Sequence, residues 1–194
     1  MASKKNTLIF FLSDNGGPER VNASDNGILR GGKSDLFEGG VRVPFAMRWP
    51  GRLPAGQKYE KPVISLDIFA TVVAQVQQPI STGNLLDLMP FLTTERSDSP
   101  HPYLFWRKFD TQQYAARNET GDKILSSREQ IRLFNLAANI REDNSLTKPD
   151  SLRSHDLNRS YQEWRSHMLD PVFLGLNEDE EYSNLHPNRF QRPD

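Results

Sequence analysis

Apolar residues form one continuous run near the start of the chain, at residues 7–12, TLIFFL. A run without alternation is typical of a strand that is covered on both faces, as in a parallel sheet. Residues 43–49, VPFAMRW, predict a second strand, because proline is tolerated at the beginning of a strand. Ser65 can cap a helix whose apolar positions mostly share one face, and Pro79 ends that helix. This order of elements predicts an α/β arrangement.

The stretch between the two predicted strands has no periodicity. Residues 16–42 are rich in glycine, which predicts one long loop, and a loop of that length inside a compact domain is usually functional or disordered. It begins directly after Ser13, Asp14 and Asn15. Polar side chains therefore gather at the carboxyl end of a buried strand, where open α/β sheets place their ligands.

From about residue 100 the pattern changes to short strand-like segments separated by polar turns. They are residues 103–107, 113–118, 123–126 and 131–136. Their spacing predicts an antiparallel meander. Apolar residues between Leu152 and Met168 then mark an amphipathic helix that starts at residue 150 or 151 and stops at Pro171. We expect Trp106 and Trp164 to be core or interface residues.

The first part supplies too few elements to cover both faces of the strand at residues 7–12. We therefore expect the chain to be the carboxyl-terminal part of a larger protein. The apolar run is shorter than the roughly 7 to 15 residues of a signal-peptide core, so we expect a buried strand there and no signal peptide. No stretch approaches the roughly 20 apolar residues of a membrane-spanning helix.

Charge and composition narrow the classes of function. The chain has 24 basic and 25 acidic residues among 194, and this balance does not indicate binding to nucleic acid or to an anionic membrane. It has no cysteine, which excludes a disulfide framework, a thiolate metal site and a cysteine nucleophile but does not fix the compartment. The four histidines are scattered and lack metal-ligand spacing, so surface or packing roles are favoured.

Residues 27–34, GILRGGKS, satisfy the phosphate-loop pattern G-x-x-x-x-G-K-[ST]. A phosphate loop needs a buried strand before it and a helix that begins at its Lys-Ser pair. Residues 16–26 are polar and turn-rich, and Gly39, Gly40 and Pro44 disfavour a helix after the loop. Both flanks argue against a nucleotide site.

Three stretches, in this order, resemble the second half of the formylglycine-dependent sulfatases, the arylsulfatase-like branch of the alkaline-phosphatase superfamily. They are NTLIFFLSDNGG, NGILRGGKSDLFEGGVRVPFAMRWPGRLPAG and SLDIFATVVA. The later LFWR, YAARNETGDKIL and IRLFNLAANIREDNSL look like the small carboxyl-terminal sheet of that family. The resemblance implies a partial alkaline-phosphatase-like α/β fold, followed by a small antiparallel sheet packed with a carboxyl-terminal helix.

We expect three regions on this basis. Residues 1–90 are the carboxyl-terminal part of the sulfatase catalytic α/β domain. Residues 91–175 form the antiparallel-sheet subdomain with its terminal helix, and residues 176–194 form a flexible tail.

The resemblance also implies roles for three residues. Asp14 and Asn15 match the aspartate and asparagine that bind an active-site calcium ion (Ca2+), and Lys33 matches the lysine that contacts the substrate sulfate. Calcium prefers six to eight oxygen ligands, so this pair is suitable but incomplete. A lysine is a compact positive charge that can stabilise the charge spread over a sulfuryl group. The residues alone leave open an ordinary turn at Asp14–Asn15 and a solvated Lys33.

The resemblance implies that the rest of the family's catalytic machinery lies upstream of this chain. Formylglycine is expected only in that missing amino-terminal part, because the C/S-x-P-x-R motif that carries it does not occur here. The resemblance implies a sulfate-ester substrate. Members of the family are often periplasmic, extracellular or lysosomal, and the location of this chain is left open. We expect the isolated chain to have little activity. The alternative is a non-catalytic fragment or binding module that needs a partner chain supplying the first half.

Three charged residues close to Lys33 have two interpretations. Arg30, Glu38 and Arg42 can form ion pairs that stabilise the loop, or they can line the pocket. The structural role is favoured.

Overall fold

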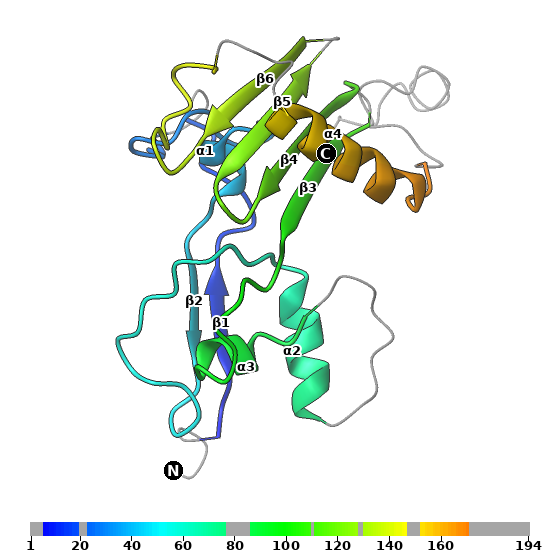
Figure 1. Ribbon diagram of the computed structural model, residues 1–194. Coiled ribbons are helices and arrows are strands. Elements are labelled where there is room, and N and C mark those ends of the chain that lie inside the picture. Colours follow the sequence, from blue (N-terminus) through cyan, green and yellow to red (C-terminus); the bar gives the residue numbers. More distant parts are fainter. Residues whose placement is uncertain are drawn as a thin grey trace, which may run out of the picture.

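A computed structural model describes residues 6–19, 23–76, 86–109, 111–127, 130–146 and 152–170. The chain is organised around two sheets (Figure 1). The first contains β1 (Ile9–Leu12) and β2 (Phe45–Arg48), and the second contains four strands in the order β3-β4-β5-β6. The expected combination of an α/β part with a later antiparallel sheet is confirmed.

The strand predicted near the start of the chain is present, but its pairing differs from the expectation. β1 pairs antiparallel with β2, with Leu12 opposite Phe45, whereas the apolar run predicted a parallel sheet. Phe11 is 68% exposed and Ile9 is 45% exposed. An unbroken apolar run predicts that both faces of a strand are covered, but it does not indicate the direction of the neighbouring strand. Here one face of β1 is left without cover by the described residues.

Helix α2 (Asp67–Gln75) forms in the predicted region but begins differently. Leu66 occupies the N-cap position without a side-chain cap, so the expected cap by Ser65 is wrong. The Asp67 carboxylate instead accepts hydrogen bonds from the Ile64 and Leu86 main-chain N–H groups at 3.0 and 3.3 Å. A carboxylate in the first turn satisfies donors and suits the positive end of the helix dipole. The predicted end at Pro79 lies outside the described residues.

The second sheet confirms the predicted meander. Its strands are β3 (Tyr103–Lys108), β4 (Gln113–Asn118), β5 (Asp122–Ser127) and β6 (Gln130–Asn135). Consecutive strands pair antiparallel throughout. Helix α4 (Leu152–Ser166), the predicted amphipathic helix, packs against one face. Two short helices, α1 (Glu38–Val41) and α3 (Met89–Leu92), complete the regular elements of the described residues.

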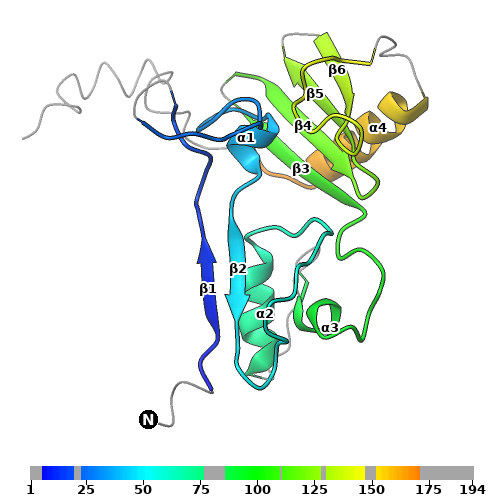
Figure 2. The same cartoon turned by 90° about the vertical axis from the view of Figure 1, so that its left-hand side faces the viewer.

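The two faces of the second sheet bury different parts of the chain, and Figure 2 shows α1 and α4 on opposite sides of it. The α4 face contains Ala116, Ile124, Leu133, Leu157 and Tyr161. The other face contains Leu36, Ala115, Leu125, Phe134 and Leu136. Successive strand residues point to opposite faces, so neighbours such as Ala115 and Ala116 serve different cores. Leu36 brings the glycine-rich loop onto the sheet. Trp106 packs on the face that contains Leu36, and Trp164 packs on the α4 face, as expected of core residues.

None of the helices in the described ranges is long and apolar enough to cross a membrane.

Candidate functional site

The polar residues after β1 form a compact turn. The exposed Asp14 accepts a hydrogen bond from the Asn15 main-chain N–H to Oδ1 at 3.0 Å. Asn15 Nδ2 donates to the Gly16 carbonyl at 2.9 Å, and Ser13 Oγ donates to the Asn15 carbonyl at 2.8 Å. These are the local side-chain bonds of an ordinary turn. They also fix two oxygen-bearing side chains next to each other at the end of the strand.

The loop that carries Lys33 returns to this turn and touches it through the main chain. The Lys33 N–H donates to the Gly17 carbonyl at 3.4 Å, and the Gly16 N–H donates to the Gly40 carbonyl at 3.1 Å. Lys33 itself is exposed and forms no salt bridge with any described residue. Thus the segments that contain Asp14, Asn15 and Lys33 are neighbours in the fold, although the contact is made by main-chain atoms.

Glycines permit this close approach. A Cβ on Gly16 would lie 1.7 Å from the Gly39 carbonyl oxygen, and a Cβ on Gly32 would lie 2.3 Å from the Gly17 carbonyl oxygen. No real Cβ tolerates such distances, so the two segments can cross only where side chains are absent. We call this contact of residues 16–17 with residues 32 and 39–40 the glycine crossing.

The same geometry argues against the phosphate-loop interpretation. Ser34 has φ of 72°, which is left-handed and incompatible with the start of a right-handed helix. Helix α1 begins only at Glu38 and includes Gly39 and Gly40. The expectation that no stable helix follows the Lys-Ser pair is therefore correct for the pair itself, while one short turn forms farther on. The glycines serve chain packing, and the match to the motif is coincidental.

Asn26 holds the loop closed from inside, a role that the sequence pattern did not reveal. Its Oδ1 accepts a hydrogen bond from the Gly17 N–H at 2.8 Å. Its Nδ2 donates to the carbonyls of Gly17 and Gly31 at 2.9 and 3.0 Å. A single amide therefore connects the segment after Asn15 with the segment before Lys33. An asparagine that precedes a glycine usually indicates only a turn, so its sequence context gave no sign of these three bonds.

Buried charges attach the loop to the second sheet. Lys123 Nζ lies 2.9 Å from Glu38 Oε1 and 3.0 Å from Glu142 Oε1, and all three residues have 0% exposure. Glu142 Oε2 accepts a hydrogen bond from the Glu38 main-chain N–H at 2.6 Å. We call Glu38, Lys123 and Glu142 the buried charge cluster. Arg42 and Arg117 also pair with Glu38, which confirms the structural interpretation of Glu38 and Arg42.

Burial and charge act in opposite directions on the two carboxyl groups of this cluster. Burial alone would raise the pKa of Glu38, but the attraction of Lys123, Arg117 and Arg42 outweighs it and holds the pKa below the ordinary value of 4.5. Burial raises the pKa of Glu142 above 4.5, and Lys123 offsets this effect only in part. Glu38 is thus the carboxylate that the surrounding cations stabilise.

Asp14 and Asn15 fit calcium in the nature of their donors, because a carboxylate and an amide carbonyl are both hard oxygen ligands. They are not a complete set. Within the described ranges, no group of three or more His, Cys, Asp or Glu residues is arranged to hold a metal ion. Calcium at this position therefore stays a prediction that requires further ligands.

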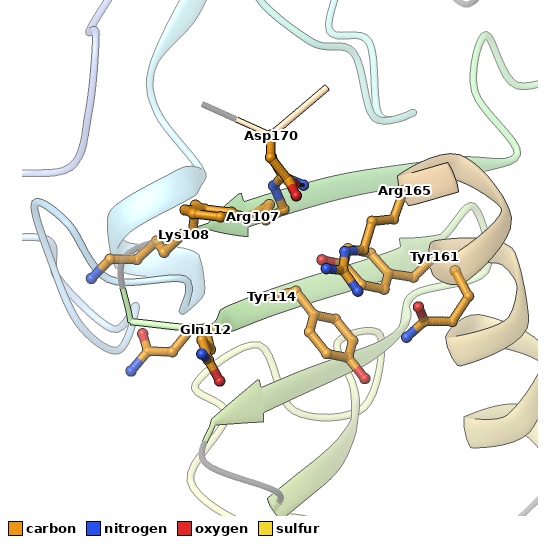
Figure 3. Close-up of a pocket in the computed structure, with 10 residues that line it drawn as sticks. Arg107, Lys108, Gln112, Tyr114, Tyr161, Arg165 and Asp170 are labelled. Atoms are coloured by element: carbon orange, nitrogen blue, oxygen red, sulfur yellow. Dashed lines mark hydrogen bonds and ion pairs between the residues drawn. The ribbon is translucent and has the colours of Figure 1, made fainter. Parts of the chain in front are cut away.

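A pocket of about 690 Å³ opens elsewhere, between the β3–β4 hairpin and the end of α4 (Figure 3). Its lining includes Arg107, Tyr114, Tyr161 and Arg165. Arg107 Nη1 is bound to Asp170 Oδ1 at 3.1 Å, and the two tyrosine rings stack on each other with centroids 3.9 Å apart. The volume suits a small ligand, but none of the three predicted site residues lines the pocket. The candidate site is therefore the loop at the glycine crossing.

Comparison with known proteins shows which family the segment containing this loop resembles. The Sulfatase family model matches residues 2–77, which contain the glycine crossing and the three predicted site residues. Residues 2–77 therefore resemble the sulfatase family. Human steryl-sulfatase is 38% identical over 109 residues, which cover 51% of this chain and 19% of that protein. Bovine arylsulfatase A is 38% identical over 108 residues, which cover 53% of this chain and 21% of that protein.

Solved structures extend the likeness of this chain to the second sheet. The crystal structure of Ps i-CgsB in complex with k-i-k-neocarrahexaose has a TM-score of 0.78 at 28% identity. The match covers 97% of this chain and 42% of that one. A Bacteroides thetaiotaomicron sulfatase, BT33336S-sulf, shares the fold with a TM-score of 0.70. This chain therefore spans about a fifth of the length of the curated relatives it matches and less than half of the solved structures.

Proposed function

We propose that this chain supplies part of the active site of an enzyme that hydrolyses sulfate esters. The observation that carries the proposal is the glycine crossing, which lies in the sulfatase-family segment and joins the Asp14–Asn15 turn to the Lys33 loop. In this proposal Lys33 Nζ contacts the sulfate of the substrate, and Asp14 and Asn15 contribute two oxygen ligands to calcium. Other ligands and formylglycine come from sequence outside this chain.

The chemistry of a sulfate ester explains why such groups are useful together. When the ester S–O bond breaks, negative charge moves to the leaving oxygen and stays spread over the sulfuryl oxygens. A fixed ammonium group stabilises that charge without reorganising during the reaction. Bound calcium would add positive charge beside the same oxygens. Lys33 is exposed and forms no ion pair with a described residue, which leaves its ammonium available to an anion.

The proposal is tested by adding sulfate and calcium to the purified chain while recording amide NMR spectra. We expect sulfate to shift the Lys33 amide, and we expect the Lys33→Ala variant to lose this response. Lys58→Ala is the matched control, because Lys58 is also an exposed loop lysine and pairs only with Glu60 among the described residues. Equal responses in the two variants would exclude a role for Lys33. We also expect no hydrolysis of a chromogenic aryl sulfate by this chain alone, and robust calcium-dependent turnover would refute that expectation.

A second candidate is that the chain acts as a module that requires a partner polypeptide. The observation in its favour is a set of exposed apolar side chains on β1 and in and around α2. These are Ile9, Phe11, Leu66, Phe69, Val72 and Val76, which are 43–68% exposed. Large apolar side chains exposed in this number indicate surface that another protein segment covers. The occupant we propose is the amino-terminal part of a sulfatase fold.

This candidate predicts that the chain alone associates with itself as its concentration rises. Sedimentation velocity measures that association directly. The double substitution Phe11→Ser with Phe69→Ser should reduce it, because both side chains are more than half exposed. A monomer that stays soluble at high concentration and unfolds cooperatively would argue against an uncovered interface.

A further inference from the structure

The loop that carries Lys33 is fixed to the second sheet by the buried charge cluster. Glu38 follows Lys33 by five positions, whereas Lys123 lies in β5 and Glu142 follows β6. The contacts therefore join residues that are 85 and 104 positions apart in the chain. They cross from the sulfatase-family segment into a region that the family model does not match.

Glu142 contacts both ends of the segment that contains Lys33. Its Oε2 accepts the Glu38 N–H at 2.6 Å, and its main-chain carbonyl accepts a hydrogen bond from Arg30 Nη1 at 2.8 Å. Arg30 also lies over the Phe37 ring, 4.2 Å from its centroid, and the Arg30 carbonyl accepts the Gly39 N–H at 2.7 Å. The segment from residue 30 to residue 39 is thus closed at its base, and Lys33 lies at its exposed tip.

Stability alone does not explain the buried charge cluster. Glu142 has φ of 54°, a left-handed conformation that is unfavourable for a residue with a long side chain. Burying two carboxylates and one ammonium also costs solvation, and apolar residues of similar size are often equally stabilising. Unlike apolar packing, such a cluster specifies one conformation of the loop, because hydrogen bonds and ion pairs depend on the direction of their partners.

We propose that Glu142 and Lys123 are positioning residues, which set the conformation of the loop so that Lys33 is presented to a sulfuryl oxyanion. The second sheet thereby takes part in the sulfate site without touching the substrate. This inference rests on the proposed function for the role of Lys33, but the link between the cluster and the loop stands on geometry alone. It predicts that substitution of Glu142 weakens the response of Lys33 to sulfate, whereas the second sheet keeps its protection from hydrogen exchange.

The test compares Glu142→Gln with Asp143→Asn in the full chain. Both substitutions remove one negative charge, and Asp143 is an exposed neighbour, so it is the matched control. Amide hydrogen exchange should become about tenfold faster at Glu38 and Gly39 in Glu142→Gln, as expected when a charge-assisted hydrogen bond is weakened to a neutral one. The amides of Ala116 and Ile124, whose side chains pack on the α4 side, should keep their protection. The concentration of sulfate that half-saturates the Lys33 amide shift should rise severalfold.

The exchange data test the positioning role, and the sulfate response tests the proposed function. Unchanged exchange at Glu38 and Gly39 overturns the positioning role, and so does an equal loss of protection across the whole sheet, which would indicate a purely structural role. If the unmodified chain shows no sulfate response, the proposed function fails while the exchange data still decide the link. Should Glu142→Gln not fold, Arg30→Gln removes the second contact with Glu142 and leaves the buried charges intact. Its loop amides must then exchange faster, or the inference is wrong.

Discussion

Replacing Asn26 by aspartate hardly changes the volume of the side chain, but it replaces the Nδ2 donor by a carboxylate oxygen, which accepts hydrogen bonds. Asn26 Nδ2 donates to the carbonyls of Gly17 and Gly31 at 2.9 and 3.0 Å. In Asn26→Asp a carboxylate oxygen faces these two carbonyl oxygens. The bond that Oδ1 accepts from the Gly17 N–H at 2.8 Å can persist. The perturbation therefore removes two of three bonds and leaves the shape intact.

The expected loss follows from those contacts. Two lost hydrogen bonds, each with a net value of about 0.5–1.5 kcal/mol, give about 1–3 kcal/mol, and the oxygen–oxygen repulsion adds to this sum. Asn26 is only half-buried, so water relieves part of the repulsion. We expect the free energy of unfolding at pH 7 to fall by about 2–4 kcal/mol.

The pH dependence makes the prediction specific. The two carbonyls raise the pKa of the introduced carboxyl in the folded state, so the protonated form is favoured there. Its O–H can donate to one carbonyl again. The penalty should therefore shrink as pH falls through that raised pKa, and it should be largest at neutral pH.

Urea unfolding at pH 7 and pH 4.5 measures both effects. The control is Asn144→Asp, since Asn144 is exposed. A variant as stable at pH 7 as the control would refute the closing role of Asn26. A penalty that grows on acidification, relative to the control, would refute the assignment of Nδ2 as the donor.

Three further predictions concern packing, pH and the contact of the sheet with α4. Gly16→Ala should lower the free energy of unfolding by about 3 kcal/mol or more, as measured in urea, because its Cβ would lie 1.7 Å from a main-chain oxygen. The pKa of Glu38 is lowered in the folded state, so its contribution to stability is lost as pH falls below about 4.5. The pKa of Glu142 is raised in the folded state, so its contribution is lost as pH rises through that raised pKa. The stability curve of Glu142→Gln should therefore lack the gain that the unmodified chain shows on mild acidification. Tyr103→Phe removes a 2.8 Å bond to Asp156 and should cost about 1 kcal/mol in thermal unfolding.

Each of these has a contrasting result. Gly27→Asn is the control for crowding, because a Cβ at Gly27 would meet nothing within 4 Å and asparagine tolerates its φ of 63°. Similar losses in the two glycine variants would show that crowding is not the cause. Superimposable pH curves of the unmodified chain and Glu142→Gln would contradict the raised pKa of Glu142. An unchanged midpoint in Tyr103→Phe would mean that water replaces the bond.

The sequence predicted the elements whose signals are local. The meander and α4 follow from short strand-like segments, polar turns and an amphipathic pattern, and their type was correct. The expectation that β1 lies in a parallel sheet differs from its antiparallel pairing with β2, because an apolar run does not indicate the direction of the neighbouring strand. Helix α1 was missed since Gly39 and Gly40 disfavour helices, and only the packing of the glycine crossing explains their presence there.

The sequence also indicated only part of the candidate site. Family motifs pointed to Asp14, Asn15 and Lys33, and their roles stay predictions. The fully buried Lys123 was not anticipated, because a lysine in a strand-like segment normally faces water. Its partners Glu38 and Glu142 lie 85 and 19 positions away, and no periodicity in a single sequence connects residues at such separations.

The glycine crossing also has a consequence for the order in which the chain assembles. It joins Gly16 to Gly40 across 24 positions, and closing so short a loop costs little chain entropy. The bond from Glu38 to Glu142 must close 104 positions. The crossing can therefore form while the strands of the second sheet are still being paired. Folding would then end when the sheet docks and the charges at the base of an already shaped loop find their partners.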